Sequence, residues 1–198
     1  MRSVAVFCGS NAGADPAFEA AAVALGEALA RRGLRLVYGG GCVGLMGVVA
    51  DAAINAGGQV LGVITHALEA KEVAHRGLTE LLVVESMHER KAAMADASDC
   101  FIMLPGGFGT LDEFFEAVTW TQLGIHAKPC GILDVNQYFE PLRVFLDHAV
   151  DQRLIRVEHR ALIVDETDPE ALLDRLAAWR PEHLDKWLDR SRHPRAQR

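Results

Sequence analysis

Short apolar runs alternate along the chain with longer segments in which apolar residues recur every three or four positions. Most of the short runs are continuous hydrophobics without polar alternation, which is typical of strands buried on both faces of a sheet. We therefore expect strands at residues 3–8, 34–38, 59–64, 81–84, 100–104, 129–133 and 161–164.

The segments between these runs have the spacing of amphipathic helices. Asp15 followed by Pro16 is typical of an N-cap and a first helical position, and Gly33 stands where that helix would end. Further helices are expected over residues 42–56, 87–98, 111–123, 138–150 and 169–179. Strands that alternate with helices predict an α/β fold, in which a doubly wound, mainly parallel sheet of about seven strands carries helices on both faces.

The length of 198 residues suits one domain, which we place at residues 1–180. Residues 181–198 are expected to form a short C-terminal helix and a basic tail, interpreted as solvated rather than functional. Ligands of doubly wound sheets bind beyond the carboxyl ends of the strands. The turns from strand to helix are therefore the places to search for chemistry.

Composition narrows the classes of partner. Half of the residues are hydrophobic and the net charge is −7, so a sizeable core is expected and a nucleic-acid partner is not. The sequence has no uncharged apolar run near the roughly 20 residues that span a bilayer, so no membrane partner is expected. Cys8, Cys42, Cys100 and Cys130 are far apart, which favours free thiols and a cytoplasmic location. Because the histidines lack a ligand spacing such as HxxxH, no metal is expected.

Two glycine-rich turns follow strands, at residues 39–47 and 105–113. Glycines there let a ligand approach the main chain, and the next helix points its free N–H groups at that ligand, which favours phosphate. Gly39, Gly40 and Gly41 are a candidate phosphate-binding turn. With Gly44 they match GxGxxG, but no acidic residue for a ribose follows about 20 positions on, so a tight turn with close helix packing is an open alternative.

The second turn contains Thr110 and Glu113 at the spacing of a capping box, as do Ser86 and Glu89. One interpretation gives Glu113 only the role of capping its own helix. The other gives it a chemical role, because it follows three glycines at the functional edge of the sheet.

Arg90 and Lys91 lie one turn into the helix after the fourth strand, which the simplest threading places beside the fifth. They could form an exposed basic helix face. Two cations near a helix start oppose the helix dipole, however, which favours an anion nearby.

Two motifs carry a family resemblance. Met87, Arg90, Lys91 and Met94 form M-x-x-R-K-x-x-M, and residues 105–113 read P-G-G-x-G-T-x-x-E. Both resemble the LOG family of cytokinin riboside 5′-monophosphate phosphoribohydrolases, over about residues 3–165. The resemblance implies a Rossmann-like fold, a homodimer with sites near the subunit interface, and no cofactor. It also implies hydrolysis of the N-glycosidic bond of a nucleoside 5′-monophosphate to the free base and ribose 5-phosphate.

Family members have also been labelled lysine decarboxylases, but none of the four lysines lies in a recognisable pyridoxal-phosphate setting. The resemblance assigns catalysis to Glu113 and Arg90, with Arg90 facing either the phosphate or the leaving base. The full set of expected substrate contacts is Glu72, Arg90, Lys91, Gly106, Gly107, Phe108, Gly109, Thr110, Leu111, Asp112, Glu113 and Thr119. Taken by itself, Glu72 is equally well a loop acid.

Three functions from different classes fit these residues. The first is the hydrolase, acting on AMP or an N6-substituted AMP, and the sequence does not say which base is preferred. The second is a nucleotide- or phosphate-binding protein without catalysis, in which Glu113 is only a cap. The third is a dinucleotide-dependent oxidoreductase, which rests on the GxGxxG match alone.

Overall fold

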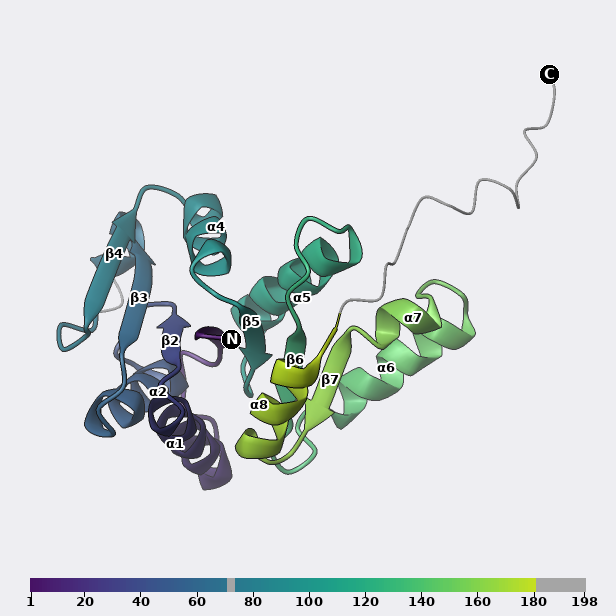
Figure 1. Ribbon diagram of the computed structural model, residues 1–198, viewed down its shortest axis with the longest axis horizontal. Coiled ribbons are helices and arrows are strands. Elements are labelled where there is room, and N and C mark those ends of the chain that lie inside the picture. The colour runs from purple at the N-terminus through teal and green to yellow at the C-terminus, as the bar shows by residue number, and fades with distance from the viewer. Residues whose placement is uncertain (71–73, 181–198) are drawn as a thin grey trace, which may run out of the picture.

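The computed structural model describes residues 1–70 and 74–180 and has a seven-stranded parallel sheet at its centre (Figure 1). The strands are β1 (Ser3–Phe7), β2 (Arg35–Tyr38), β3 (Val60–Thr65), β4 (Glu80–Val84), β5 (Cys100–Met103), β6 (Cys130–Leu133) and β7 (Ile163–Glu166). Their order in the sheet is β4-β3-β2-β1-β5-β6-β7. The helices are α1 (Pro16–Arg31), α2 (Gly44–Asn55), α3 (His66–Glu69), α4 (Met87–Asp96), α5 (Phe108–Gln122), α6 (Glu140–Asp151), α7 (Val157–Arg160) and α8 (Pro169–Ala178).

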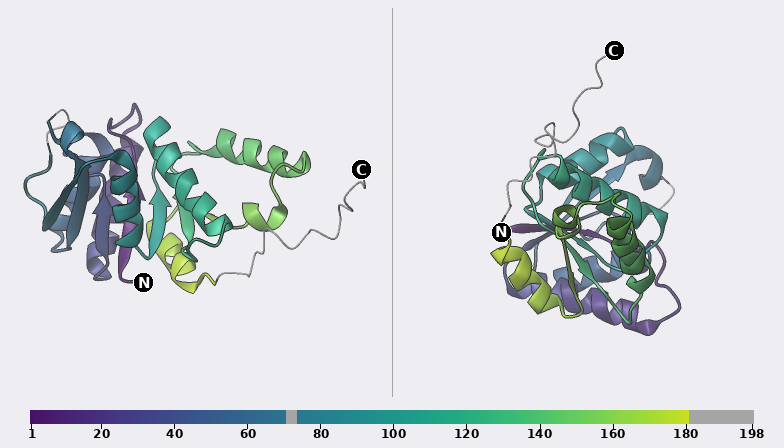
Figure 2. Two further views of the ribbon diagram at one scale, coloured as in Figure 1. Left: turned by 90° about the horizontal axis from the view of Figure 1, so that it is seen from above. Right: turned by 90° about the vertical axis from the view of Figure 1, so that its right-hand side faces the viewer.

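Two hydrophobic cores lie on opposite faces of the sheet, because successive side chains of a strand point to opposite faces. In β1, Val4 and Val6 belong to the core under α1, α2 and α8, whereas Ala5 and Phe7 belong to the core under α4, α5 and α6. Figure 2 shows α1 and α8 on one side of the sheet and the teal helices on the other. The predicted doubly wound α/β fold is confirmed.

The fourth strand does not lie beside the fifth, as the simplest threading had placed it. β4 is at the edge of the sheet, and β3, β2 and β1 separate it from β5. After β4 the chain crosses back through α4 to the centre, and the order of strands reverses between β1 and β5. In open α/β sheets a crevice forms outside the carboxyl ends of the two strands at such a switch point.

Most predicted helices agree with the structure to within two or three residues. α1 begins as expected, with the Asp15 carboxylate accepting a hydrogen bond from the Ala17 N–H at 2.9 Å. α5 begins at Phe108, three residues earlier than predicted. The single-turn helices α3 and α7 were not predicted, because four residues are too few to show a helical period.

Two expectations fall on residues that the structure does not describe. Glu72 and the C-terminal segment 181–198 lie outside the described ranges. Among the helices that are described, none combines the length and apolarity that crossing a membrane requires.

Candidate active site

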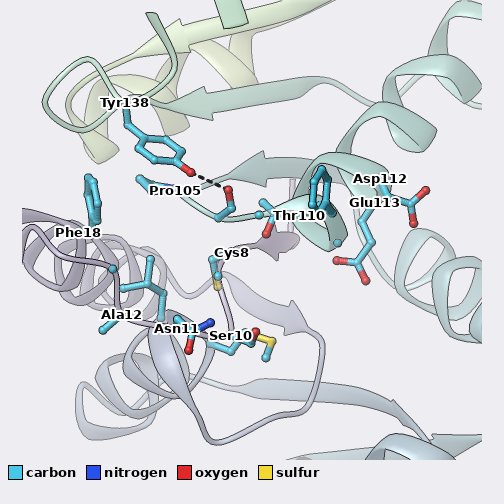
Figure 3. Close-up of a pocket in the computed structure, with 18 of the residues that line it drawn as sticks. Cys8, Ser10, Asn11, Ala12, Phe18, Pro105, Thr110, Asp112, Glu113 and Tyr138 are labelled. Carbon is cyan, nitrogen blue, oxygen red and sulfur yellow. Dashed lines mark hydrogen bonds between the residues drawn. The ribbon is translucent and has the colours of Figure 1, made fainter. Parts of the chain in front are cut away.

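A cavity of about 470 Å³ opens at the switch point between β1 and β5 (Figure 3). Its two main walls are the turn after β1, from Cys8 to Gly13, and the segment after β5 from Pro105 to Thr110, which comprises a short turn and the start of α5. This is a volume in which a nucleotide-sized ligand fits. The remaining lining residues are Phe18 of α1, Leu45 and Met46 of α2, Leu68 of α3, Met87 and Arg90 of α4, Asp112 and Glu113 of α5, and Tyr138 before α6.

Arg90 and Glu113 form a buried ion pair at one side of this cavity. The Nη1 atom of Arg90 donates to Oε1 of Glu113 at 2.8 Å, and the two side chains are only 7% and 13% exposed. Arg90 also donates from Nε to the carbonyl oxygen of Val63 at 2.9 Å and from Nη2 to that of Gly39 at 3.2 Å. Arg90 is therefore not part of an exposed basic helix face.

The glycine turn after β2 makes room for this guanidinium. A Cβ atom on Gly39 would lie 2.2 Å from Nη2 of Arg90, so the guanidinium would have to leave its present position. Gly40 has a φ of +78° and packs against Ile64 of β3, and its carbonyl oxygen accepts from the His75 N–H at 3.0 Å. Gly39, Gly40 and Gly41 are not among the residues that line the cavity. The geometry thus supports the tight-turn interpretation more than the phosphate-binding one.

The capping box predicted at Thr110 and Glu113 does not form. Because α5 begins at Phe108, Thr110 lies inside the helix, and the N-cap position falls to Gly107, which has no side chain to accept a bond. The Glu113 carboxylate faces Arg90 instead. By contrast, the Oγ atom of Ser86 accepts from the Glu89 N–H at 3.2 Å, so the N-cap half of that predicted box is confirmed, while the Glu89 carboxylate accepts from the Glu85 N–H at 3.1 Å.

Burial raises the pKa of Glu113, and the positive charges of Arg90 and Lys91 oppose that rise. Arg90 occupies only one carboxylate oxygen, and the described residues provide Oε2 with no hydrogen-bond partner. In Figure 3 the carboxylate points away from α5, toward the space between this helix and the Ser10–Asn11 turn. The group therefore has one oxygen held in place and one that can meet a ligand.

The start of α5 presents main-chain donors to the same cavity. The first N–H bonded inside the helix is that of Leu111, which donates to the carbonyl oxygen of Gly107 at 3.1 Å. The amides of Phe108, Gly109 and Thr110 precede it, and all three residues line the cavity. Such a helix start, with its positive dipole end, favours an anion.

A family model described as a possible lysine decarboxylase matches residues 46–176. The cytokinin riboside 5′-monophosphate phosphoribohydrolase LOG5 of Arabidopsis thaliana is 47% identical over 181 residues, or 91% of this chain and 79% of that protein. The cytokinin riboside 5′-monophosphate phosphoribohydrolase of Rhodococcoides fascians is 48% identical over 173 residues, or 87% of each chain. The chain belongs to the LOG family.

Solved structures with the same fold include more distant proteins. The molybdenum cofactor carrier protein of Chlamydomonas reinhardtii aligns with a TM-score of 0.67 at 21% identity, over 90% of this chain and 99% of that one. The molybdenum cofactor binding protein of Rippkaea orientalis aligns with a TM-score of 0.66 at 21% identity, over 89% and 96%. At this identity the likeness establishes the Rossmann-like fold that the LOG family shares with them, and nothing about the ligand.

Several expected contacts of the LOG family lie beside the cavity rather than in it. The Nζ atom of Lys91 pairs with Asp112 at 2.7 Å and with Glu116 at 3.2 Å, so it faces α5. Leu111 is partly buried in the core under α5. The Thr119 hydroxyl donates to the carbonyl oxygen of Phe115 at 2.7 Å, within its own helix. Gly106, Gly107, Phe108, Gly109, Thr110, Asp112, Glu113 and Arg90 do line the cavity.

Sequence reasoning missed more than half of the residues that line the cavity in this LOG-family chain. The turn Ser10–Gly13 lines it, as do the side chains of Met46, Leu68 and Tyr138, none of which was predicted as a contact. The turn had a usable signal, since small and turn-forming residues follow the first strand directly. The described residues contain no group of three His, Cys, Asp or Glu side chains that could hold a metal ion.

Proposed function

We propose that this protein hydrolyses the N-glycosidic bond of a nucleoside 5′-monophosphate and releases the free base and ribose 5-phosphate. The observation that carries the proposal is the juxtaposition, in one cavity, of the amide-presenting start of α5 and the buried Glu113 carboxylate. The names of the 47–48% identical relatives support the same reaction.

The start of α5 would hold the 5′-phosphate. The amides of Phe108, Gly109 and Thr110 supply donors without cationic side chains, and the glycines leave the main chain open to close approach. A phosphate fixed here orients the ribose relative to Glu113, which lies one turn further along the same helix. Binding energy from a group remote from the scissile bond thus positions the reacting carbon.

Glu113 would act on the ribose. Cleavage of an N-glycosidic bond builds positive charge on the sugar ring, and a carboxylate nearby stabilises that charge. Two unit charges about 4 Å apart interact by about 4 kcal/mol at an effective dielectric of about 20, which is roughly a thousandfold in rate if gained only in the transition state. The free Oε2 atom is available for the ribose hydroxyls or for the attacking water.

Arg90 would act through Glu113. Each of its three nitrogens donates a hydrogen bond, to Val63, Gly39 or Glu113. The guanidinium charge is therefore paired with the Glu113 carboxylate. It fixes the direction of Oε1 and keeps Glu113 more acidic than burial alone would allow. This makes Arg90 a positioning residue for the acid rather than a direct ligand of the phosphate.

The base would lie against the apolar wall of the cavity, formed by Leu45, Met46, Leu68 and Met87. Flat, apolar surfaces suit the faces of a purine ring. The substrates proposed are AMP and N6-substituted AMP.

We propose in addition that the protein is a homodimer located in the cytoplasm. Helices α6 and α7 lie at the β7 end of the molecule (Figure 1). Val144 and Phe145 of α6, Leu154 before α7 and Val157 of α7 are large apolar side chains that are exposed. A second copy would cover them.

The four cysteines all lie in the part of the chain that the structure describes and form no disulfide, which suits a reducing compartment such as the cytoplasm. Because one sheet carries the whole cavity, residues 1–180 are proposed as a single catalytic domain.

The reaction is tested by incubating the purified protein with a panel of nucleoside 5′-monophosphates and the matching nucleosides, and by measuring the free base by chromatography. We expect release of base from the monophosphate and not from the nucleoside. Recovery of every nucleotide intact would contradict the proposal and leave a binding protein. Sedimentation velocity tests the dimer, and Phe145→Asp should then give monomers.

A further inference from the structure

The loop between β6 and α6 has an unusual backbone. Asn136 and Gln137 are consecutive and have φ angles of 50° and 61°, in the left-handed region that residues with side chains rarely adopt. Such strain costs about 1–3 kcal/mol per residue and persists only where the surroundings impose it. The residue that follows these two is Tyr138, which lines the cavity.

Three contacts hold this loop in place. The Phe139 N–H donates to Oδ1 of the buried Asp134 at 3.0 Å. The Nδ2 atom of Asn136 donates to Oδ2 of Asp15, the N-cap of α1, at 2.8 Å. The Tyr138 hydroxyl donates to the carbonyl oxygen of Gly106 at 2.8 Å (Figure 3). The loop therefore joins both sides of the switch-point crevice.

The ring of Tyr138 is also fixed. It meets the ring of Phe18 edge-to-face, with centroids 5.3 Å apart and planes at 74°. Phe18 in turn packs against Gly13, where a Cβ atom would lie 2.7 Å from the Phe18 ring. Both aromatic residues line the cavity, so the direction of the Tyr138 hydroxyl is set by its surroundings.

The hydroxyl of Tyr138 reaches a peptide that its own two residues restrain little. It joins Gly106 to Gly107, and a peptide between two glycines rotates more freely than any other. In a trans peptide the C=O and the following N–H point in opposite directions. Fixing the Gly106 carbonyl therefore fixes the direction of the Gly107 N–H, at the N-cap of the helix that presents the phosphate donors.

We infer that Tyr138 is a positioning residue for the sugar phosphate: its hydroxyl locks the Gly106–Gly107 peptide and so preorganises the main-chain donors at the start of α5. This inference rests on the proposed function, because it assumes that a phosphate binds there. The strained loop is the device that delivers the hydroxyl to a turn 32 residues away in sequence.

The test uses Tyr138→Phe, which keeps the ring against Phe18 and removes only the hydroxyl. Tyr38→Phe is the matched control, since the Tyr38 hydroxyl is buried and has no partner among the described residues. Binding of ribose 5-phosphate is measured by calorimetry. The net contribution of one neutral hydrogen bond corresponds to about fivefold in a binding constant. We therefore expect Tyr138→Phe to bind ribose 5-phosphate about fivefold more weakly than the wild type, and Tyr38→Phe to bind it with unchanged affinity.

Steady-state kinetics separate positioning from general damage. Main-chain donors that are less well oriented bind the phosphate more weakly in the ground state and in the transition state alike, so KM for the nucleotide should rise about fivefold while kcat stays within twofold. Equal affinity of wild type and Tyr138→Phe for ribose 5-phosphate would overturn this inference alone. A kcat that falls with KM unchanged would also overturn it. Failure of the wild type to bind ribose 5-phosphate would overturn both this inference and the phosphate site of the proposed function.

Discussion

Arg90 donates to Oε1 of Glu113 at 2.8 Å although the two residues come from different helices, α4 and α5. The Nε and Nη2 atoms of Arg90 donate to main-chain carbonyls of β3 and of the turn after β2. The pair thus connects the half of the sheet that contains β2 and β3 with the helix that follows β5. It brings a carboxylate to the cavity with a fixed direction and a charge that burial alone would disfavour.

The first prediction concerns Glu113→Gln. The amide oxygen can still accept from Arg90, so the shape of the site should persist while the negative charge is lost. We expect kcat to fall about a thousandfold, from the loss of about 4 kcal/mol of transition-state stabilisation. Affinity for ribose 5-phosphate should change less than threefold. Base release and calorimetry measure the two quantities.

Glu116→Gln is the control for that variant. Glu116 lies one turn further along α5, pairs with Lys91, and is largely outside the cavity. Its kcat should stay within threefold of the wild type. Wild-type turnover by Glu113→Gln would remove Glu113 from the mechanism.

The second prediction concerns Arg90→Lys. An ammonium cannot reach the three separate acceptors that the planar guanidinium serves, so the carbonyls of Val63 and Gly39 lose their buried donor. Each unsatisfied buried group costs about 1–3 kcal/mol. We expect the free energy of unfolding in urea to fall by about 2–4 kcal/mol and turnover to fall as well.

Arg175→Lys provides the comparison for Arg90→Lys. Arg175 pairs with Glu166 at 2.7 Å, but its side chain is half exposed, so the exchange should change the free energy of unfolding by less than about 0.5 kcal/mol. Equal effects of the two exchanges would mean that the contacts of Arg90 do not stabilise the fold.

The third prediction concerns pH. Glu113 must be ionised to stabilise a cation, and its pKa is raised by burial. Activity should therefore be lost, as pH falls, at a pH above the ordinary pKa range of a glutamate.

The charge of Lys91 lowers the pKa of Glu113, so Lys91→Gln should move the acid limb of the kcat/KM profile to higher pH. The substrate phosphate itself titrates near about pH 6, so the difference between the two proteins is the quantity to measure. An unchanged or lower acid limb in Lys91→Gln would contradict this electrostatic coupling.

The strands could be predicted from the sequence because each is a local apolar run, and local patterns encode burial on a sheet. The surroundings of Arg90 could not. Its burial depends on carbonyls 27 and 51 residues away, and no nearby residue signals them. The start of α5 was misplaced for a related reason. Glycines near a helix start favour a turn locally, whereas here Phe108, Gly109 and Thr110 form the first turn of α5 and the Thr110 side chain packs against Gly106.

The family motifs predicted Glu113 and the glycine turn after β5 as parts of the site. They did not predict the turn after β1 or Tyr138. Tyr138 reaches the cavity through two left-handed residues, and sequence patterns do not predict that conformation for asparagine followed by glutamine. Its partner carbonyl lies 32 residues earlier. Contacts across the switch point depend on the order of the strands, which the alternation of strands and helices leaves open.

The fourth prediction compares two glycines that share a left-handed backbone and differ in their surroundings. Gly44 has a φ of +58°, and a Cβ atom there would lie 2.3 Å from the main-chain carbon of Ser10, in the turn that lines the cavity. Gly124 has a φ of +71°, and a Cβ atom there would have no atom of the described residues within 4 Å apart from those of Gly124 and its two chain neighbours.

Gly124→Ala should cost about 1–2 kcal/mol of unfolding free energy from backbone strain alone and keep kcat/KM within twofold. Gly44→Ala adds a clash between two main-chain segments, so it should cost at least twice as much in unfolding free energy. It should also lower kcat/KM more than tenfold, because the Ser10 turn must move. Equal losses of stability and activity in the two variants would show that the close packing of Gly44 on this turn does not shape the site.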